Sequence, residues 1–176
     1  MEKVEKLRKI FNIEKIDGYI IPKNDEFFSE YIPVHSDRLN FISNFSGSYG
    51  FALILKDKNY LFVDGRYTLQ AKIQSGKHFE IITIPKKLPS DVLKKKKLKI
   101  GFDPQLHTKK TLKIFFKNTS CKFISKNKNF IDKLWKRKKN GILKKFYALP
   151  KKAVGQSYKY KINNLTNILK KKKINF

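Results

Sequence analysis

The segment from Asp17 to Ala71 constrains the fold of this chain more than any other part of the sequence. It contains two densely punctuated blocks. Asn44–Gly50 carries two glycines three residues apart, and in Phe62–Ala71 a strand-like run ends abruptly on an Asp-Gly-Arg-Tyr turn. Short apolar runs that stop at turn residues are typical of strands in a buried sheet rather than of long helices. This segment therefore predicts a domain built around a sheet.

Short apolar runs continue along the chain and predict about six strands. The first, Gly18–Pro22, is continuously apolar, as in a strand buried on both faces, and its proline ends it. The second and third are separated only by Lys56–Asn59, which predicts a hairpin. The six predicted strands are Gly18–Pro22, Phe51–Leu55, Tyr60–Val63, Phe79–Ile84, Leu98–Phe102 and Lys122–Ile124, the last at an edge of the sheet.

Helical periodicity appears between these strands. Apolar residues at helical spacing predict helices over residues 2–13, 38–45, 67–74 and 108–117. Thr108 is the expected N-cap of the last helix, and Gly47 is the expected terminator of the second. A hairpin together with helical crossovers predicts an α/β fold, with a mixed sheet of about six strands and helices on both faces.

Length and composition limit the class of protein. The 176 residues suffice for one domain of ordinary size and a fragment of another, and 15 phenylalanines supply a core. No apolar run approaches the roughly 20 residues of a membrane helix, and the N-terminus has no signal-peptide pattern. The single cysteine, Cys121, excludes an internal disulfide and is expected to act as a small buried apolar residue. These features predict a cytoplasmic protein.

The net charge of +27 is unevenly distributed. Residues 104–176 hold 22 lysines and arginines against one acid, Asp132. Such a field attracts nucleic acid or anionic lipid nonspecifically at low salt. However, 37 of the 41 basic residues are lysine, so arginine, the usual reader of base edges, is scarce. No helix-turn-helix, Walker or dinucleotide-binding motif occurs either. A specific nucleic-acid function is not expected.

Six motifs, taken in order and spacing, suggest a family. The motifs are Ile21-Pro22 with Ser29-Glu30-Tyr31; Arg38, Phe41, Ser43, Phe45, Gly47 and Ser48; Val63–Ala71; Gly101, Asp103 and Pro104; Asp132 and Trp135; and Gly155 and Ser157. In their order and spacing, the chain resembles the N-terminal domain of the creatinase/aminopeptidase P family over essentially its whole length. It departs from the family at Phe27 and Phe28, which stand where a His-Gln pair is common.

The resemblance implies a three-part enzyme. It divides this chain into a creatinase-like N-terminal domain (1–134), a basic linker (135–155) and the first helix of a second creatinase-like domain (156–176). A catalytic pita-bread domain, which cleaves before proline, would hold two metal ions, usually manganese, on two Asp, one His and two Glu. The three histidines here form no such spaced set, so we expect this chain to contain no catalytic residue, to bind no cofactor and to be inactive alone.

The turn at Asp64–Tyr67 has two interpretations. In the structural one, Asp64 caps the following helix, Gly65 supplies the turn, and Arg66 pairs with a neighbouring carboxylate. In the functional one, Arg66 lines a cleft facing the catalytic domain or a dimer partner and meets a substrate carboxylate. Asp64, Arg66, Tyr67 and Arg38 are therefore the candidate residues for substrate access or an interface.

The C-terminal segment predicts a basic amphipathic helix. Tyr158, Ile162, Leu165 and Leu169 form one stripe after Ser157. By the resemblance, this stripe would pack on the sheet of the second domain; a basic helix of this kind can also lie on an anionic membrane.

Two functions follow from the sequence. By the resemblance, the chain is expected to be the non-catalytic N-terminal part of an Xaa-Pro aminopeptidase, either as a truncated product or as half of a split enzyme. Its partner would be the catalytic domain or a second copy of the chain. Alternatively, it is a free-standing basic module for an acidic partner, nucleic acid or anionic lipid.

Overall fold

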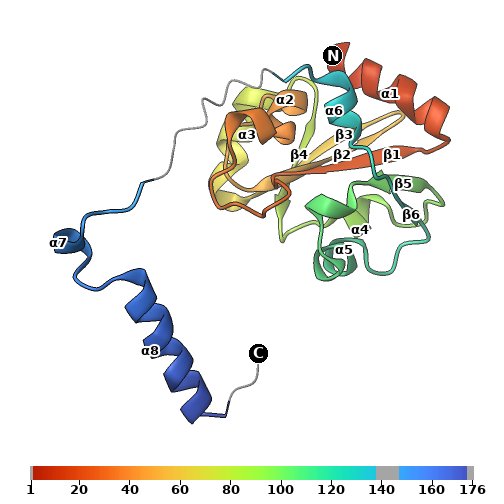
Figure 1. Ribbon diagram of the computed structural model, residues 1–176. Coiled ribbons are helices and arrows are strands. Elements are labelled where there is room, and N and C mark those ends of the chain that lie inside the picture. The colour runs from red at the N-terminus through yellow and green to blue at the C-terminus, as the bar shows by residue number, and fades with distance from the viewer. Residues whose placement is uncertain (1, 138–146, 174–176) are drawn as a thin grey trace. The chain divides into compact units, whose positions relative to one another are not determined.

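The computed structural model describes residues 2–137 and 147–173 of the chain (Figure 1). These residues fall into two compact units, Met1–Lys139 and Asn140–Phe176. The first unit holds the sheet and the second holds two helices, and each is treated separately below.

A mixed six-stranded sheet forms the centre of the first unit. Its strand order is β4-β3-β2-β1-β5-β6, so β6 lies at an edge as predicted. The hairpin partners β2 and β3 are antiparallel, as are β1 and β2, whereas the remaining neighbours are parallel. The strands are β1 Gly18–Pro22, β2 Gly50–Leu55, β3 Asn59–Asp64, β4 Glu80–Ile84, β5 Lys99–Phe102 and β6 Lys122–Ser125. All six predicted strands are therefore confirmed.

Helices lie between the strands as the periodicity predicts, with two additions. The predicted helices are present within a few residues, and the short helices α4 and α6 were not predicted. The helices of the first unit are α1 Glu2–Glu14, α2 Arg38–Ser43, α3 Thr68–Ser75, α4 Pro89–Val92, α5 Lys109–Phe116 and α6 Phe130–Leu134, with 3₁₀ turns η1 Val34–Ser36, η2 Gly65–Tyr67 and η3 Pro104–Leu106. Thr108 caps α5 as expected, since its Oγ1 accepts a hydrogen bond from the Thr111 N–H at 3.1 Å.

Alternate residues of each strand point into two separate cores. On β1, Tyr19 and Ile21 pack with α1, α2, α3 and α6, whereas Ile20 packs on the opposite face with α5 and Leu93, the residue that follows α4. Figure 1 shows the same division, with α4 and α5 on one side of the sheet and the other helices on the other. The prediction of helices on both faces is confirmed. The β1 strand is buried at every position because both faces are covered.

The end of α2 differs from the prediction. The helix stops at Ser43, and Asn44 adopts a left-handed conformation with φ 63° while its N–H donates to the Asn40 carbonyl. Asn44, not Gly47, therefore terminates the helix, because the short polar side chain of asparagine tolerates this conformation. Gly47 is needed for space instead, since a Cβ there would lie 2.3 Å from the ring of Phe45.

Trp135 belongs to the first unit. Its ring stacks on Phe41 with centroids 4.9 Å apart, and it packs against the core that α1 and α2 share. Trp135 is thus a packing residue of this core. Cys121 is half-buried, and its Sγ lies 3.4 Å from the Lys96 carbonyl oxygen.

The second unit contains α7 Lys151–Val154 and α8 Tyr158–Lys171. Ser157 caps α8, because its Oγ accepts a hydrogen bond from the Tyr160 N–H at 3.2 Å. The predicted C-terminal helix is thus present. Part of the predicted linker, residues 138–146, lies outside the described residues, and the three-part division of the chain stays a prediction. No helix among the described residues is long and apolar enough to cross a membrane.

Candidate functional site

The Asp64–Tyr67 turn follows β3 and is held by hydrogen bonds between two of its own residues, Asp64 and Arg66. The Asp64 Oδ1 accepts a hydrogen bond from the Arg66 N–H at 2.9 Å, and its Oδ2 accepts another from Arg66 Nη2 at 2.6 Å. The predicted cap and the predicted carboxylate partner of Arg66 are thus the same residue. The hydrogen bond from Arg66 lowers the pKa of Asp64, and the same bond raises the pKa of Arg66. Asp64 therefore orients the guanidinium while capping the turn.

Tyr67 anchors this turn to the glycine-containing block. Its hydroxyl lies 2.6 Å from Ser48 Oγ, and its ring meets Phe45 edge-on at 5.9 Å. The two blocks that dominate the sequence therefore meet in space. One consequence is that the backbone carrying Arg66 is held at both ends, by Asp64 and by Tyr67.

Arg66 itself faces solvent. Its side chain is 74% exposed, and Leu69 and Ile73, which follow at helical spacing, are 73% and 77% exposed. An exposed arginine beside two exposed aliphatic side chains is a surface suited to meeting another molecule. Arg66 both pairs with Asp64 in the turn and is exposed to solvent, so the structure is compatible with either interpretation of this residue. A role of this surface in substrate access or in contacts with a partner stays a prediction.

Arg38 is in a different environment from Arg66. Its side chain is 1% exposed and donates to both oxygens of Asp132 at 2.9 Å each and also to Glu26. Burial acts to lower the pKa of Arg38, but the hydrogen bonds to Asp132 and Glu26 outweigh it and raise that pKa. Within residues 2–137, no hydrogen bond or ion pair joins Arg38 to Asp64, Arg66 or Tyr67. The structure therefore separates Arg38 from the other three candidates and fixes it between α6 and the loop after β1.

The residues that the structure describes do not fit a metal pair. No group of three or more His, Cys, Asp or Glu side chains is placed to hold a metal ion in residues 2–137 and 147–173. We therefore assign no chemical step to manganese within this part of the chain.

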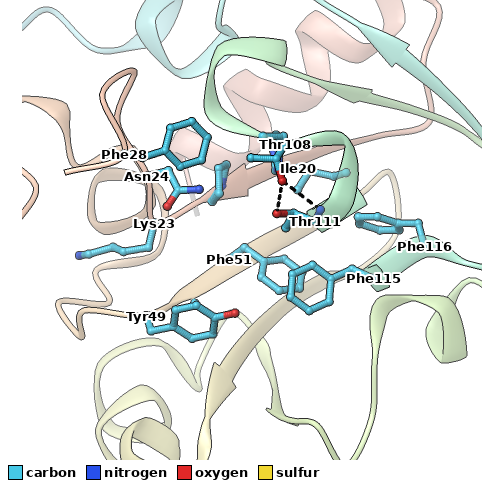
Figure 2. Close-up of a pocket in the computed structure, with 13 residues that line it drawn as sticks. Ile20, Lys23, Asn24, Phe28, Tyr49, Phe51, Thr108, Thr111, Phe115 and Phe116 are labelled. Atoms are coloured by element: carbon cyan, nitrogen blue, oxygen red, sulfur yellow. Dashed lines mark hydrogen bonds between the residues drawn. The ribbon is translucent and has the colours of Figure 1, made fainter. Parts of the chain in front are cut away.

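A pocket of about 260 Å³ lies beside the carboxyl ends of β1 and β5. Aromatic side chains form much of its wall, and Figure 2 shows the rings of Phe51 and Phe115 next to each other at its centre. Their centroids are 4.9 Å apart. The lining also includes Ile20, Pro22, Lys23, Asn24, Phe28, Tyr49, Gly50, His107, Thr108, Thr111 and Phe116.

His107 is a polar residue of the pocket wall. Its Nε2 is buried without a hydrogen bond in the described structure, and burial lowers the pKa of His107 to about 4. The imidazole is therefore neutral at pH 7. The sequence offered no signal for this site, because its residues come from three separate stretches of chain, 20–28, 49–51 and 107–116. The closest hint was the Asp103-Pro104 element, which is separated from His107 by Gln105 and Leu106.

Comparison with known proteins agrees with this architecture. Residues 3–132 match the model of the creatinase/prolidase N-terminal domain, so the chain belongs to that family. The probable Xaa-Pro aminopeptidase P of Coprinopsis cinerea is 33% identical over an alignment of 183 residues, gaps included. This alignment covers 95% of this chain but 28% of that protein. Xaa-Pro aminopeptidase 1 of Dictyostelium discoideum is 36% identical over 146 residues, covering 76% of this chain and 23% of the relative.

Solved structures extend the comparison. The X-prolyl aminopeptidase of Caenorhabditis elegans, described as a cytosolic enzyme with a di-nuclear active site, aligns with a TM-score of 0.77 and 27% identity. The alignment covers 98% of this chain and 31% of the C. elegans protein. An Xaa-Pro dipeptidase of Bacillus anthracis aligns with a TM-score of 0.58 and 25% identity, covering 76% of this chain and 35% of that protein. The chain thus spans 28% of the length of two curated relatives that are named as probable Xaa-Pro aminopeptidase P.

Proposed function

We propose that this chain forms the non-catalytic N-terminal domain of an Xaa-Pro aminopeptidase. The observation that carries the proposal is the family match over residues 3–132, together with relatives that are Xaa-Pro aminopeptidases by name and about 33% identical. In this proposal the catalytic residues and two manganese ions belong to a separate domain. That domain is part of the same enzyme or a separately encoded half.

The proposed task of the domain is to pack on the catalytic domain, contribute to oligomer contacts and shape the access of substrate. The surface formed by Arg66, Leu69 and Ile73 is our candidate for this contact. Its exposure supports the assignment, as does the orientation of the guanidinium by Asp64. A guanidinium held in this way matches the geometry of a carboxylate, either at a substrate terminus or on a partner domain.

The proposed location is the cytoplasm. The single cysteine supports it, because a chain that cannot form an internal disulfide suits a reducing compartment. The C. elegans relative is itself described as cytosolic.

Release of the residue before proline, measured with manganese, tests the proposal. The full chain is assayed alone and then mixed with the C. elegans enzyme from which the corresponding first domain has been deleted. We expect no activity from the chain alone and a gain of activity in the mixture. A chimera in which this chain replaces that domain covers the case of weak association. Hydrolysis by the chain alone would contradict the proposal.

Arg66→Ala in the chimera separates the two interpretations of the turn. An increase in KM or a fall in kcat, with an unchanged unfolding midpoint, supports a role of Arg66 in access. Unchanged kinetics with reduced stability would leave Arg66 as a turn residue only. Arg66→Lys is the matched variant, since it keeps the charge and loses the two-pronged geometry. Salt-sensitive binding of one acidic partner by the chain, without any gain of activity, would favour the alternative of a free-standing basic module.

A further inference from the structure

The pocket beside the ends of β1 and β5 has a position that the topology explains. β1 and β5 are parallel neighbours, so their carboxyl ends lie side by side. The chain leaving β1 leads to α2 on one face of the sheet, whereas the chain leaving β5 leads to α5 on the other. Connections that diverge in this way open a crevice, and open α/β sheets usually bind their ligands in such crevices.

Most polar side chains around the pocket are buried or paired with other protein groups. The Lys23 ammonium pairs with Asp37 at 2.5 Å, and the Asn24 amide donates to the Leu106 carbonyl at 3.0 Å. The two threonine hydroxyls of the wall bond to each other at 2.7 Å, and the Nε2 of His107 has almost no accessible surface. An apolar group, which needs no hydrogen bond, therefore suits this wall.

The size of the pocket and the rings in its wall suit one aromatic side chain. A cavity of about 150 Å³ lined by apolar side chains holds benzene, and drug-sized ligands need about 300–1,000 Å³. At about 260 Å³, this pocket lies between the two. Phe51 stacks on Phe62 and meets Phe115, both at 4.9 Å between ring centroids, so its ring is held in place. Offset or edge-on contact of a further ring with such a cluster is favourable.

Exposed apolar side chains extend around the pocket. Phe28 and Tyr49, which line it, are 48% and 45% exposed. Figure 2 shows both to one side of the central Phe51 ring. Ile114 of α5 is 52% exposed as well. A free ring in the pocket would leave most of this surface in contact with water, whereas a polypeptide would cover it around one anchoring side chain. These exposures favour a polypeptide as the occupant.

The rim of the pocket at Phe28 is already formed. Phe28 has φ 54°, a conformation uncommon for a bulky residue, and its N–H donates to the Asp25 carbonyl at 3.2 Å. The buried Asp25 carboxylate accepts from the N–H groups of Phe27 and Ser29 at 3.1 and 2.9 Å. A rim held in this way loses little freedom when a partner binds.

The first turn of α5 borders the pocket through Thr111 and is strongly basic. Lys109 and Lys110 begin this helix, both are exposed, and neither forms an ion pair within residues 2–137. The turn holds no acid, and its lysines add to the positive end of the helix dipole. Carboxylates beside the anchoring ring would therefore be attracted here. The net charge of +27 argues against a second copy of the chain as the partner.

We propose that this pocket binds a phenylalanine side chain of another polypeptide whose neighbouring residues are acidic. The ring lies against Phe51 and Phe115, and the carboxylates lie near Lys109 and Lys110. A nucleobase fits less well, because its polar edge would stay unpaired against this wall. The site shares no residue with the Arg66 surface and does not depend on the proposed aminopeptidase function.

Titration of the full chain with acetyl-Glu-Phe-Glu-amide at low salt, followed by NMR, tests the site. One matched peptide has alanine in place of phenylalanine, and another has glutamine in place of both glutamates. We expect saturable shifts at Tyr49, Thr111 and Phe115. The alanine peptide should bind about tenfold more weakly, as the lost burial of a ring allows. The glutamine peptide should bind about threefold more weakly, because exposed charge pairs contribute little each.

Variants of the chain separate the apolar and the charged parts of the site. Thr111→Phe places a ring in the pocket and should abolish binding, whereas Thr111→Ala keeps the space and should retain it. Lys109→Gln together with Lys110→Gln should remove the preference for the glutamate peptide over the glutamine peptide. Lys9→Gln together with Lys77→Gln removes the same charge at exposed lysines of α1 and of the turn after α3, and should leave that preference intact.

Four results would overturn the proposal. They are equal binding of the phenylalanine and alanine peptides, binding that survives Thr111→Phe in folded protein, a glutamate preference that survives the loss of Lys109 and Lys110, and no saturable shift at all. The fluorescence of Trp135 reports whether each variant is folded. N-acetyl-phenylalanine amide is the last probe. Binding of this compound as tight as that of the tripeptide would also contradict the proposal, because the pocket would then take a free ring without acidic neighbours.

Discussion

Helices α1 and α8 have the same kind of sequence and different surroundings. Both are amphipathic, with 13 and 14 residues. In α1 the apolar stripe of Val4, Leu7 and Phe11 is buried against the sheet, whereas no residue of α8 is buried in the described structure. Leu165, in the middle of the α8 stripe, is 56% exposed. Periodicity thus predicts a helix and the direction of its apolar face, but not whether another surface covers that face.

Local signals in the sequence favour α8. Ser157 caps its N-terminus, and Lys170 and Lys171 in the last turn oppose the negative end of the helix dipole. These contributions are small, and isolated helices of this length are marginal in water. We therefore expect α1 to be stable as part of the sheet domain and α8 to fray, or to associate with itself or another surface.

Truncating one leucine in each helix gives the largest expected contrast. Leu7→Ala removes a fully buried side chain and should lower the free energy of unfolding by about 2–5 kcal/mol. Leu165→Ala should change it by less than about 0.5 kcal/mol. Urea unfolding followed by Trp135, the only tryptophan of the chain, measures both. A comparable loss from Leu165→Ala would mean that the apolar face of α8 is covered in solution.

The same contrast applies to the two arginines that the sequence singled out. Arg38→Ala should cost about 3 kcal/mol, at the low end for a buried pair, because Asp132 and Glu26 remain about one-third exposed to water. Arg66→Ala, at a largely exposed side chain, should leave the unfolding midpoint nearly unchanged. Equal midpoints for both variants, again followed by Trp135, would show that the Arg38 pairs add no net stability.

The pH dependence of stability should reveal His107. Its folded-state pKa is lowered by burial to about 4 from 6.5, so between these values the unfolded chain binds more protons than the folded one. Its contribution is therefore complete above pH 6.5 and is lost as the pH falls, by up to about 3 kcal/mol at pH 4.

His107→Gln tests that dependence. The difference in unfolding free energy between this variant and the natural chain should change between pH 6.5 and 4. His78→Gln, at an exposed histidine, is the control and should follow the natural chain at every pH. Parallel pH profiles for the natural chain and His107→Gln would show that His107 is not buried in solution.

The smallest expected effect concerns the cap of α8. Ser157→Ala removes the acceptor of the Tyr160 N–H and should cost the helix about 1 kcal/mol. Carbon chemical shifts over residues 158–171 should move towards random-coil values, while the Trp135 unfolding midpoint stays constant. An unchanged helix would indicate that contacts of its apolar face, rather than the cap, hold α8 together.

Two helices and one helix end differ from the sequence-based prediction, and each difference has an identifiable cause. The helices α4 and α6 contain four and five residues, too few for an apolar periodicity to appear. The helix α2 was predicted to end at residue 45 with Gly47 as its terminator, because glycine is the commonest terminator, but Asn44 already adopts the required conformation. Strands were more predictable, because each is a short apolar run bounded by turn residues.

The candidate residues show a similar division. Asp64 and Arg66 are two positions apart, and their pairing followed from turn chemistry alone. Arg38 meets Asp132 across 94 residues of chain, so no local pattern revealed its burial. The pocket combines the end of β1, the start of β2, the loop after β5 and helix α5, and was not predicted for the same reason.

The sequence by itself determined the order of strands and helices along the chain, the hairpin, the cap of α5, the Asp64–Arg66 turn and the family resemblance. All of these depend on the conformational preferences of a few neighbouring residues or on their spacing. Only the tertiary structure decided which apolar faces are covered, which arginine is buried, and that β1 and β5 end beside a pocket with His107 in its wall. These features depend on contacts between distant segments, whose burial and hydrogen bonding arise only when the chain is folded.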